Sequence, residues 1–287
     1  MILIADSGST KTHWALIAAN GDVTECVTDG INPFFQTMEA MKNTISNQLL
    51  PKIGQLLWVG PITDVFFYGA GCTPEKKSFV RDAVGAIFRK SQIHVESDMI
   101  GAARALLGSN RGVACILGTG SASCLWNGAE IEQTVPSLGF ILGDEGSGAT
   151  LGKRLVSDLL KNQLSEALKQ QFLQEKSTTM AEIIENVYRK PFPNRYLSKL
   201  SEFAAAHIDE PQIHDLVYQH FKEFATRNLQ QYPAELSVGF VGGVAYYYQD
   251  VLREVTDALH IQVANIVKDP VQELIVFHRK DARPTDE

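Results

Sequence analysis

Cysteine is scarce in this sequence, and no two of its four cysteines form a C-x-x-C pair. A chain of 287 residues needs no disulfide framework, so we expect the four to be small buried side chains rather than metal or redox groups. Long apolar runs are also missing, since none approaches the roughly 20 residues that a membrane helix needs. The first residues, MILIAD, lack the basic start of a signal peptide. We therefore expect a cytoplasmic protein without a membrane partner.

Positive charge is limited as well. The chain carries 26 lysines and arginines against 33 aspartates and glutamates, a net charge of −7. No segment shows the clustered lysine and arginine that a nucleic-acid surface needs, so we expect no nucleic-acid partner. An anionic ligand would have to be held by backbone N–H groups, a metal ion or a few local cations. The seven histidines are scattered without the spacing of zinc ligands.

Two stretches of the sequence share one pattern. The first is ILIADSGSTKTHWALI at 2–17, and the second is ACILGTGSASCLWN at 114–127. Each has a short apolar run, a turn of Gly, Ser and Thr, and a second apolar run, which predicts strand, tight turn and strand. A length of 287 residues and a hydrophobic content of 45% allow two packed domains. The repeat therefore predicts two lobes of similar construction.

The pattern between and after these hairpins alternates between strands and helices. In the first half we expect a strand at 23–28, a helix within 38–57, a strand at 64–68, a helix at 74–89, a strand at 93–96 and a helix at 99–107. In the second half we expect a strand at 130–135, a helical region over 147–231, a strand at 237–241, a helix at 244–259, a strand at 261–265 and a last helix from 270. Such alternation indicates α/β lobes with mainly parallel sheets. The expected boundaries are 1–108 for the first lobe, which the last helix at 270–280 can complete, and 109–269 for the second, with a helical insertion.

The two glycine turns have the composition of an anion-binding site. Their backbone N–H groups can converge on a phosphate, and small side chains let its oxygens approach closely. Asp6 ends the first predicted strand, where its carboxylate can hold Mg²⁺ through water, and Lys11 can add a point charge. The alternative for either turn alone is an ordinary hairpin. A P-loop is excluded, because Thr10 rather than glycine precedes Lys11.

A third glycine turn lies in the segment GFVGGVAYYY at 239–248. Gly242 and Gly243 stand between a predicted strand and a predicted helix. The free N–H groups at a helix start can bind a phosphate, so this turn is a candidate site for the α-phosphate or the adenosine of a nucleotide. Close packing of strand on helix is the alternative explanation.

Three glycine turns in this order, with Asp6 in the first, resemble the superfamily of actin, hexokinase and the actin-like heat-shock chaperones. Further segments resemble the N-acetylglucosamine kinase and BadF/BadG/BcrA/BcrD-type ATPase family: GINPFF at 30–35, FYGAGC at 67–72, ESDMIGAARA at 96–105, LGTGSASCLW at 117–126, LGDEGSGATLG at 142–152 and DPVQELIVFH at 269–278. These segments span essentially the whole chain, and LGDEGSG is the most specific of them. The resemblance implies an α/β fold of two ribonuclease-H-like lobes with a central ATP cleft, ATP and Mg²⁺ as cofactors, and a homodimer.

The resemblance also assigns roles to individual residues. Asp98 matches the catalytic base that accepts the proton of the attacking hydroxyl, although by local pattern it also suits a helix N-cap. Asp144 and Glu145 match groups that bind sugar hydroxyls; for Glu145, a role in capping the helix from Ser147 is the alternative. Asn32 and Gly71 are assigned to the sugar as well, and Asn32 equally suits an Asn-Pro turn.

The remaining assignments concern the nucleotide and the metal. The metal is expected at Asp6, and the nucleotide is expected at Gly8, Ser9, Thr10, Lys11, Gly118, Thr119, Gly120, Ser121, Gly242 and Gly243.

The sequence therefore predicts an ATP-dependent kinase that phosphorylates the primary hydroxyl of an amino sugar, with N-acetylglucosamine as the first candidate. One alternative is an ATP-hydrolysing activator or switch of the BadF type that acts on a protein partner. The cysteines do not match the iron–sulfur pattern of such activators, which disfavours electron transfer. The other alternative is a non-catalytic sugar sensor. No linear motif distinguishes N-acetylglucosamine from glucosamine or N-acetylmuramic acid as the acceptor.

Overall fold

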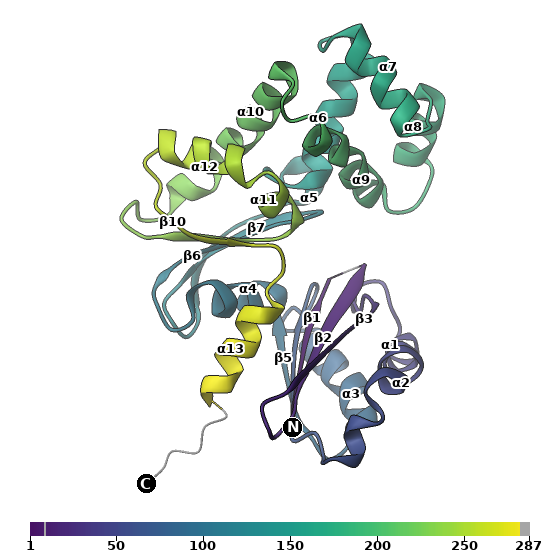
Figure 1. Cartoon of the computed structure of the whole chain (residues 1–287), viewed down its shortest axis with the longest axis vertical. Helices are drawn as coiled ribbons and strands as arrows, with labels where there is room; N and C mark the ends of the chain where they lie inside the picture. The colour runs from purple at the N-terminus through teal and green to yellow at the C-terminus, as the bar shows by residue number, and fades with distance from the viewer. Residues whose placement is uncertain (9, 282–287) are drawn as a thin grey trace. The chain divides into compact units, whose positions relative to one another are not determined.

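The computed structural model describes residues 1–8 and 10–281 (Figure 1). The chain divides into two compact units. The first contains residues 1–109 together with the chain from 270 onward, and the second contains residues 110–269. Each unit is built around its own five-stranded sheet.

The two sheets have the same topology. Strand order is β3-β2-β1-β4-β5 in the first unit and, read in the matching direction, β8-β7-β6-β9-β10 in the second. In each unit the first three strands form an antiparallel meander, and the last two run parallel to the first strand. The repeated hairpin in the sequence predicts this duplication, and the α/β fold class is confirmed.

The first unit contains the elements that the alternating pattern predicts. Its strands are β1 (Ile2–Ser7), β2 (Lys11–Ile17), β3 (Val23–Asp29), β4 (Asp64–Gly69) and β5 (Gln92–Ser97). Its helices are α1 (Met38–Thr44), α2 (Leu50–Ile53), α3 (Lys77–Ile87), α4 (Asp98–Leu107) and α13 (Val271–Asp281), with a π-helical turn (Ile45–Leu49) between α1 and α2 and a 3-10 turn (Leu56–Trp58) after α2. The predicted helix at 74–89 therefore begins three residues later than expected.

Helices cover both faces of the first sheet. Leu3 and Ala5 of β1 belong to a core with residues of α1 and α3. Ile4, between them, belongs to a second core with Val271 and Leu274 of α13. Figure 1 shows α4 and α13 on one side of this sheet and α1 to α3 on the other. Because both faces are buried, β1 is a continuous apolar run rather than an alternating one.

The second unit places most of its helices after its antiparallel meander. Its strands are β6 (Gly112–Leu117), β7 (Ser121–Trp126), β8 (Ile131–Val135), β9 (Val238–Val241) and β10 (Val263–Val267). Its helices are α5 (Gly139–Leu142), α6 (Gly148–Leu160), α7 (Glu166–Glu175), α8 (Met180–Tyr188), α9 (Pro193–Ala206), α10 (Pro211–Arg227), α11 (Gly243–Tyr247) and α12 (Gln249–Ala258), with a 3-10 turn (Leu229–Gln231) after α10. The short helix α5 was not predicted from the sequence.

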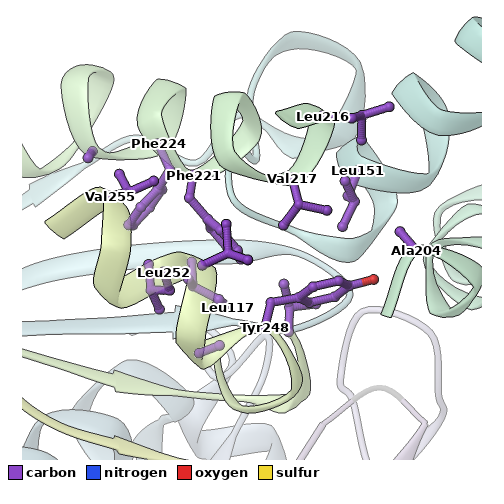
Figure 2. Packing of buried hydrophobic residues seen from close by; sticks show 14 of the residues in the cluster. Leu117, Leu151, Ala204, Leu216, Val217, Phe221, Phe224, Tyr248, Leu252 and Val255 are labelled. Atoms are coloured by element: carbon purple, nitrogen blue, oxygen red, sulfur yellow. The ribbon is translucent and has the colours of Figure 1, made fainter. Parts of the chain in front are cut away.

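The single helix predicted at 244–259 is wrong, because the chain breaks at Tyr248 into α11 and α12. The Tyr248 side chain is buried, and its hydroxyl donates a hydrogen bond to the carbonyl of Ser201 over 2.5 Å. Figure 2 shows Tyr248 in the same apolar core as Phe221 of α10 and Leu252 of α12. This tertiary packing overrides the local preference for one continuous helix.

Within the described residues, no helix combines the length and the apolar character that crossing a membrane requires.

Candidate functional site

In the first unit, the two predicted carboxylates lie at the carboxyl ends of parallel strands. Ser7 of β1, Gly69 of β4 and Ser97 of β5 are neighbours in register. Asp6 lies one residue before this edge of the sheet, and Asp98 lies one residue after it. Ligands of α/β sheets bind outside the carboxyl ends of the strands. The topology therefore gathers both predicted carboxylates at the edge where a ligand site is expected.

The first glycine turn is fixed by backbone hydrogen bonds at its two ends. The N–H of Gly8 donates to the carbonyl of Lys11 over 3.0 Å, and the N–H of Gly30 donates to the carbonyl of Thr10 over 3.0 Å. Ser9, a predicted phosphate contact, lies outside the described residues. The predicted nucleotide contacts of this turn stay predictions.

Asp98 is the first residue of α4 and not its N-cap. The cap is Ser97, whose hydroxyl accepts a hydrogen bond from the N–H of Ile100 over 3.3 Å. The N-cap alternative for Asp98 is therefore wrong. Asp98 Oδ1 accepts a hydrogen bond from the N–H of Met99 over 2.9 Å. Burial raises the pKa of Asp98, while backbone hydrogen bonds act to lower it. A carboxylate with a raised pKa is a stronger proton acceptor, which suits a general base.

Asn32 and Gly71 are in close contact in the first unit. Asn32 is buried, and its Oδ1 accepts a hydrogen bond from the N–H of Phe34 over 2.9 Å, so its role in the Asn-Pro turn is confirmed. An ideal Cβ on Gly71 would lie 2.6 Å from the same Oδ1, and the φ of Gly71 is +78°. Only glycine fits at position 71 without moving Asn32.

In the second unit, the carbonyl groups of the second glycine turn are bound to α6. The carbonyls of Gly118 and Thr119 accept hydrogen bonds of 2.8 and 3.2 Å from the N–H groups of Gly148 and Ala149, at the start of that helix. By contrast, the N–H groups of Thr119 and Gly120 make no hydrogen bond to any residue within 1–8 or 10–281. Backbone N–H groups that have no acceptor within the protein can bind an anion.

Asp144 lies against the same turn. Its Oδ2 would be 3.1 Å from an ideal Cβ on Gly120, and its carboxylate interacts with the backbone of Ser121. Burial raises the pKa of Asp144, the backbone of Ser121 acts to lower it, and the neighbouring charge of Glu145 adds to the increase. The φ of Asp144 is +57°, a left-handed conformation that is uncommon for a residue other than glycine. Strained backbone of this kind clusters at functional sites.

The third glycine turn contacts the second. The φ of Gly242 is +125°, and an ideal Cβ there would lie 2.3 Å from the carbonyl oxygen of Leu117. The N–H of Gly242 donates to the carbonyl of Val267 at the end of β10 over 3.0 Å. The structure therefore brings the turn at 118–121, Asp144 and the turn at 242–243 together within one unit.

Two basic side chains beside these residues were not singled out from the sequence. Arg227 at the end of α10 forms an ion pair with Glu145, with 2.7 Å between Nε and Oε1. Lys268 follows β10, and its Nζ lies 2.6 Å from the hydroxyl of Tyr247 in α11. Lys268 lies three residues beyond the strand predicted at 261–265, which could have marked it, whereas no linear pattern connects Arg227 to Glu145.

The residues at the first sheet edge fit a loosely held magnesium ion. No group of three or more His, Cys, Asp or Glu side chains gathers as metal ligands in the part of the chain that the structure describes. Asp6 is therefore not part of a cluster of such side chains that could coordinate a metal ion by themselves. One carboxylate is sufficient for Mg²⁺, which keeps several waters and takes its other ligands from substrate phosphates.

The four cysteines are largely withdrawn from solvent. Cys72, Cys115 and Cys124 are buried, as the sequence predicts, and Cys26 is partly buried. Burial raises the pKa of Cys72 and of Cys124 to about 12. Both thiols therefore stay protonated and unreactive at neutral pH.

No family model matches this chain, and no curated protein matches it. Among solved structures, it is similar to the “Putative N-acetylglucosamine Kinase” from Porphyromonas gingivalis, with 45% identity and a TM-score of 0.94 over 99% of this chain and 100% of that one. A second “Putative N-acetylglucosamine Kinase”, from Chromobacterium violaceum, has 17% identity and a TM-score of 0.74 over 96% and 98% of the two chains. The ethanolamine utilization protein EutJ from Carboxydothermus hydrogenoformans has 15% identity and a TM-score of 0.56 over 96% and 87%. The last two share the fold alone.

Proposed function

The chain belongs to the N-acetylglucosamine kinase family, and from this membership we propose that it transfers the γ-phosphate of ATP to the primary hydroxyl of N-acetylglucosamine or a related amino sugar. The observation that carries the proposal is the 45% identity to the P. gingivalis protein over 99% of the chain. The actin- and hexokinase-type fold of the chain is compatible with this activity, although the fold by itself does not specify it.

Asp98 is the proposed catalytic base. It accepts the proton of the primary hydroxyl as that oxygen attacks the γ-phosphorus. Two observations support the role: the position of Asp98 at the carboxyl end of β5, and the raised pKa that its burial causes. General-base catalysis is typically worth about 10²–10⁴-fold in rate, so positioning and charge must supply the rest of the acceleration.

The proposed phosphate-binding groups are the N–H groups of Thr119 and Gly120, because they have no other acceptor among the described residues. Gly242 and Gly243 are the proposed adenosine contacts, and the contact of Gly242 with Leu117 and Gly118 supports this assignment. When bound near Asp6, Mg²⁺ would offset the charge of the β- and γ-phosphates.

The proposed sugar contacts are Asn32, Gly71, Asp144 and Glu145. The carboxylates and the amide can accept hydrogen bonds from sugar hydroxyls, and the Asn32 amide can also donate. The homodimer and the cytoplasmic location that the family implies stay predictions.

The test is ATP consumption by the purified protein with Mg²⁺, measured with and without a panel of hexoses and amino sugars. The proposal expects strong stimulation by one amino sugar and a sugar monophosphate in the product by mass spectrometry. ATP turnover that is indifferent to every sugar would instead support the activator or switch. Sugar binding without any turnover would support the sensor.

A further inference from the structure

One face of α10 contacts the turn that carries the two acidic residues. His220, Phe224 and Arg227 are spaced at i, i+4 and i+7, so all three lie on the same side of the helix. Together they contact all three residues of the segment 145–147. The helix therefore supports this turn along two helical turns of its length.

Phe224 and Arg227 contact two adjacent residues of the turn. An ideal Cβ on Gly146 would lie 2.9 Å from Cγ of Phe224, and the φ of Gly146 is +81°. The aromatic ring thus packs directly on the backbone of the turn. One helical turn further on, Arg227 Nε lies 2.7 Å from Oε1 of Glu145.

His220 completes the contact on the other side of Phe224. Its imidazole is buried and interacts with the backbone of Gly146 and Ser147. Burial lowers the pKa of His220 to about 4, so the ring is neutral at pH 7. The neutral ring of His220 therefore packs beside the start of α6 without placing a positive charge there.

The helix that makes these contacts is firmly anchored. Phe221 and Phe224 are buried in the core of the second unit, and Figure 2 shows them with Leu252 and Val255 of α12. A side chain held by such a packed helix has a well-defined position, which binding sites need.

The ion pair between Arg227 and Glu145 is asymmetric in its burial. The Glu145 side chain is 17% exposed, whereas the Arg227 side chain is 59% exposed. An exposed ion pair typically contributes little to stability. The guanidinium lies directly beside the more buried carboxylate and can restrict its orientation. The contact is made through Oε1, and Oε2 can accept a hydrogen bond from a ligand.

We propose that Arg227 is a positioning residue for amino-sugar binding: it fixes the Glu145 carboxylate in the orientation that accepts the sugar hydroxyl, on a turn that Phe224 and His220 hold in place. This inference rests on the proposed function, because it specifies how one of the proposed sugar contacts is oriented. Arg227 itself touches no substrate in this role, so its loss should affect sugar binding more than phosphate transfer.

The experiment compares steady-state kinetics of the wild-type protein with those of Arg227→Gln and Arg227→Lys. We expect Arg227→Gln to raise the KM for the amino sugar tenfold or more, with less than a threefold change in kcat and in the KM for ATP. Lysine keeps the positive charge but lacks the planar guanidinium group, so Arg227→Lys should recover only part of the affinity for the amino sugar. If Arg227→Gln folds poorly, the KM of Arg227→Lys for the amino sugar tests the proposal instead.

Arg111→Gln is the matched control. Arg111 forms an Arg–Glu pair of similar length, 2.8 Å, with Glu132, and its side chain is 49% exposed. The control should leave both KM values unchanged. A second comparison places Arg227→Gln in a Glu145→Gln background, where it should cause no further loss if Arg227 acts through Glu145.

The outcomes separate the inference from the function on which it rests. An active wild-type protein in which Arg227→Gln behaves like Arg111→Gln would overturn the inference alone, as would an equal loss with and without Glu145. A wild-type protein that neither phosphorylates any amino sugar nor binds one by calorimetry would overturn the proposed function and the inference together.

Discussion

Gly242 lies against the carbonyl oxygen of Leu117, with only 2.3 Å between that oxygen and the place where a Cβ on Gly242 would be. The contact joins the end of β6 to the turn after β9, two parallel neighbours in the second sheet. Glycine is therefore required at 242 for two reasons, its φ of +125° and the lack of space.

Replacement of Gly242 by alanine should destabilise the second unit strongly. Left-handed strain and overpacking each cost about 1–3 kcal/mol, so we expect a loss of roughly 3 kcal/mol or more in the free energy of unfolding. The matched control is Gly139→Ala in the same unit, where φ is +74° but no atom lies within 4 Å of the added Cβ. Strain alone should cost the control about 1 kcal/mol. Equal losses in urea denaturation would show that the contact with Leu117 is unimportant.

Asp98→Asn should lower kcat by about 10²–10⁴-fold, because an amide cannot accept the proton of the sugar hydroxyl. The KM for ATP should change little. The fold should be retained, since Ser97 caps α4 and an asparagine oxygen can still accept the hydrogen bond from Met99. Turnover within a few-fold of the wild-type value would contradict the base assignment.

Ser97→Ala provides the companion variant for Asp98→Asn. Removing the cap should lower the free energy of unfolding by about 1 kcal/mol, a stability effect that Asp98→Asn should not show. Thermal melting of both variants measures this difference. If the two variants lose stability equally, the effect of Asp98→Asn on kcat cannot be assigned to proton transfer.

Stability should fall in mild acid because of His278. This ring stacks on Phe66 at 3.9 Å between centroids, and its Nε2 lies 2.8 Å from the hydroxyl of Tyr68. Burial lowers the pKa of His278 to about 4, and Arg104 and His94 nearby act in the same direction, whereas Asp64 acts to raise it. The unfolded chain therefore protonates His278 near pH 6.5, whereas the folded chain keeps the ring neutral until the pH approaches 4.

The contribution of His278 is thus fully present above pH 6.5 and is lost as the pH falls toward 4. For one such histidine, the loss between pH 7 and pH 5 is about 2 kcal/mol. Urea denaturation at both pH values should show a smaller acid-induced loss in His278→Gln than in the wild-type protein. The comparison isolates His278, because all other titrating groups are shared. Identical losses would show that His278 does not titrate differently on unfolding.

Asp6→Asn should raise the Mg²⁺ concentration that half-maximal activity needs. If Asp6 holds the ion through water, the shift should be about 10–100-fold, the usual range for groups that support metal ligands indirectly. Removal of Mg²⁺ by EDTA should abolish turnover of every variant. Asp22→Asn is the control, because Asp22 is exposed in the turn between β2 and β3 and pairs with Asn20. A magnesium requirement unchanged in Asp6→Asn would exclude Asp6 from the metal site.

The sequence predicts those parts of the structure that depend on local pattern. The hairpin at 2–17 and its counterpart at 114–127 predict the two sheets, because the spacing of apolar residues and the composition of the turns determine locally where strands form. The break at Tyr248 is not visible in this way, since it depends on a hydrogen bond to Ser201 in another helix. The same limit applies to Arg227, whose partner Glu145 is brought near only by the packing of α10.

Only part of the site could be predicted from the sequence, because some of its contacts join segments that are distant in the chain. The edge position of Asp98 follows from its place between the strand predicted at 93–96 and the helix predicted at 99–107. Asp144 approaches Gly120 with a left-handed backbone, a conformation that the sequence alone does not locate. The assignments of substrate and nucleotide contacts come from family resemblance and stay predictions.

The return of α13 to the first sheet has a consequence for the order of folding during synthesis. Val271 and Leu274 supply part of the core that contains Ile4 and Tyr68, so α4 alone covers that face of the first sheet until those residues leave the ribosome. The second unit is continuous in sequence, from 110 to 269, and can be complete earlier. Although domains generally fold in the order of their translation, the first unit of this chain should be the last to reach its native packing.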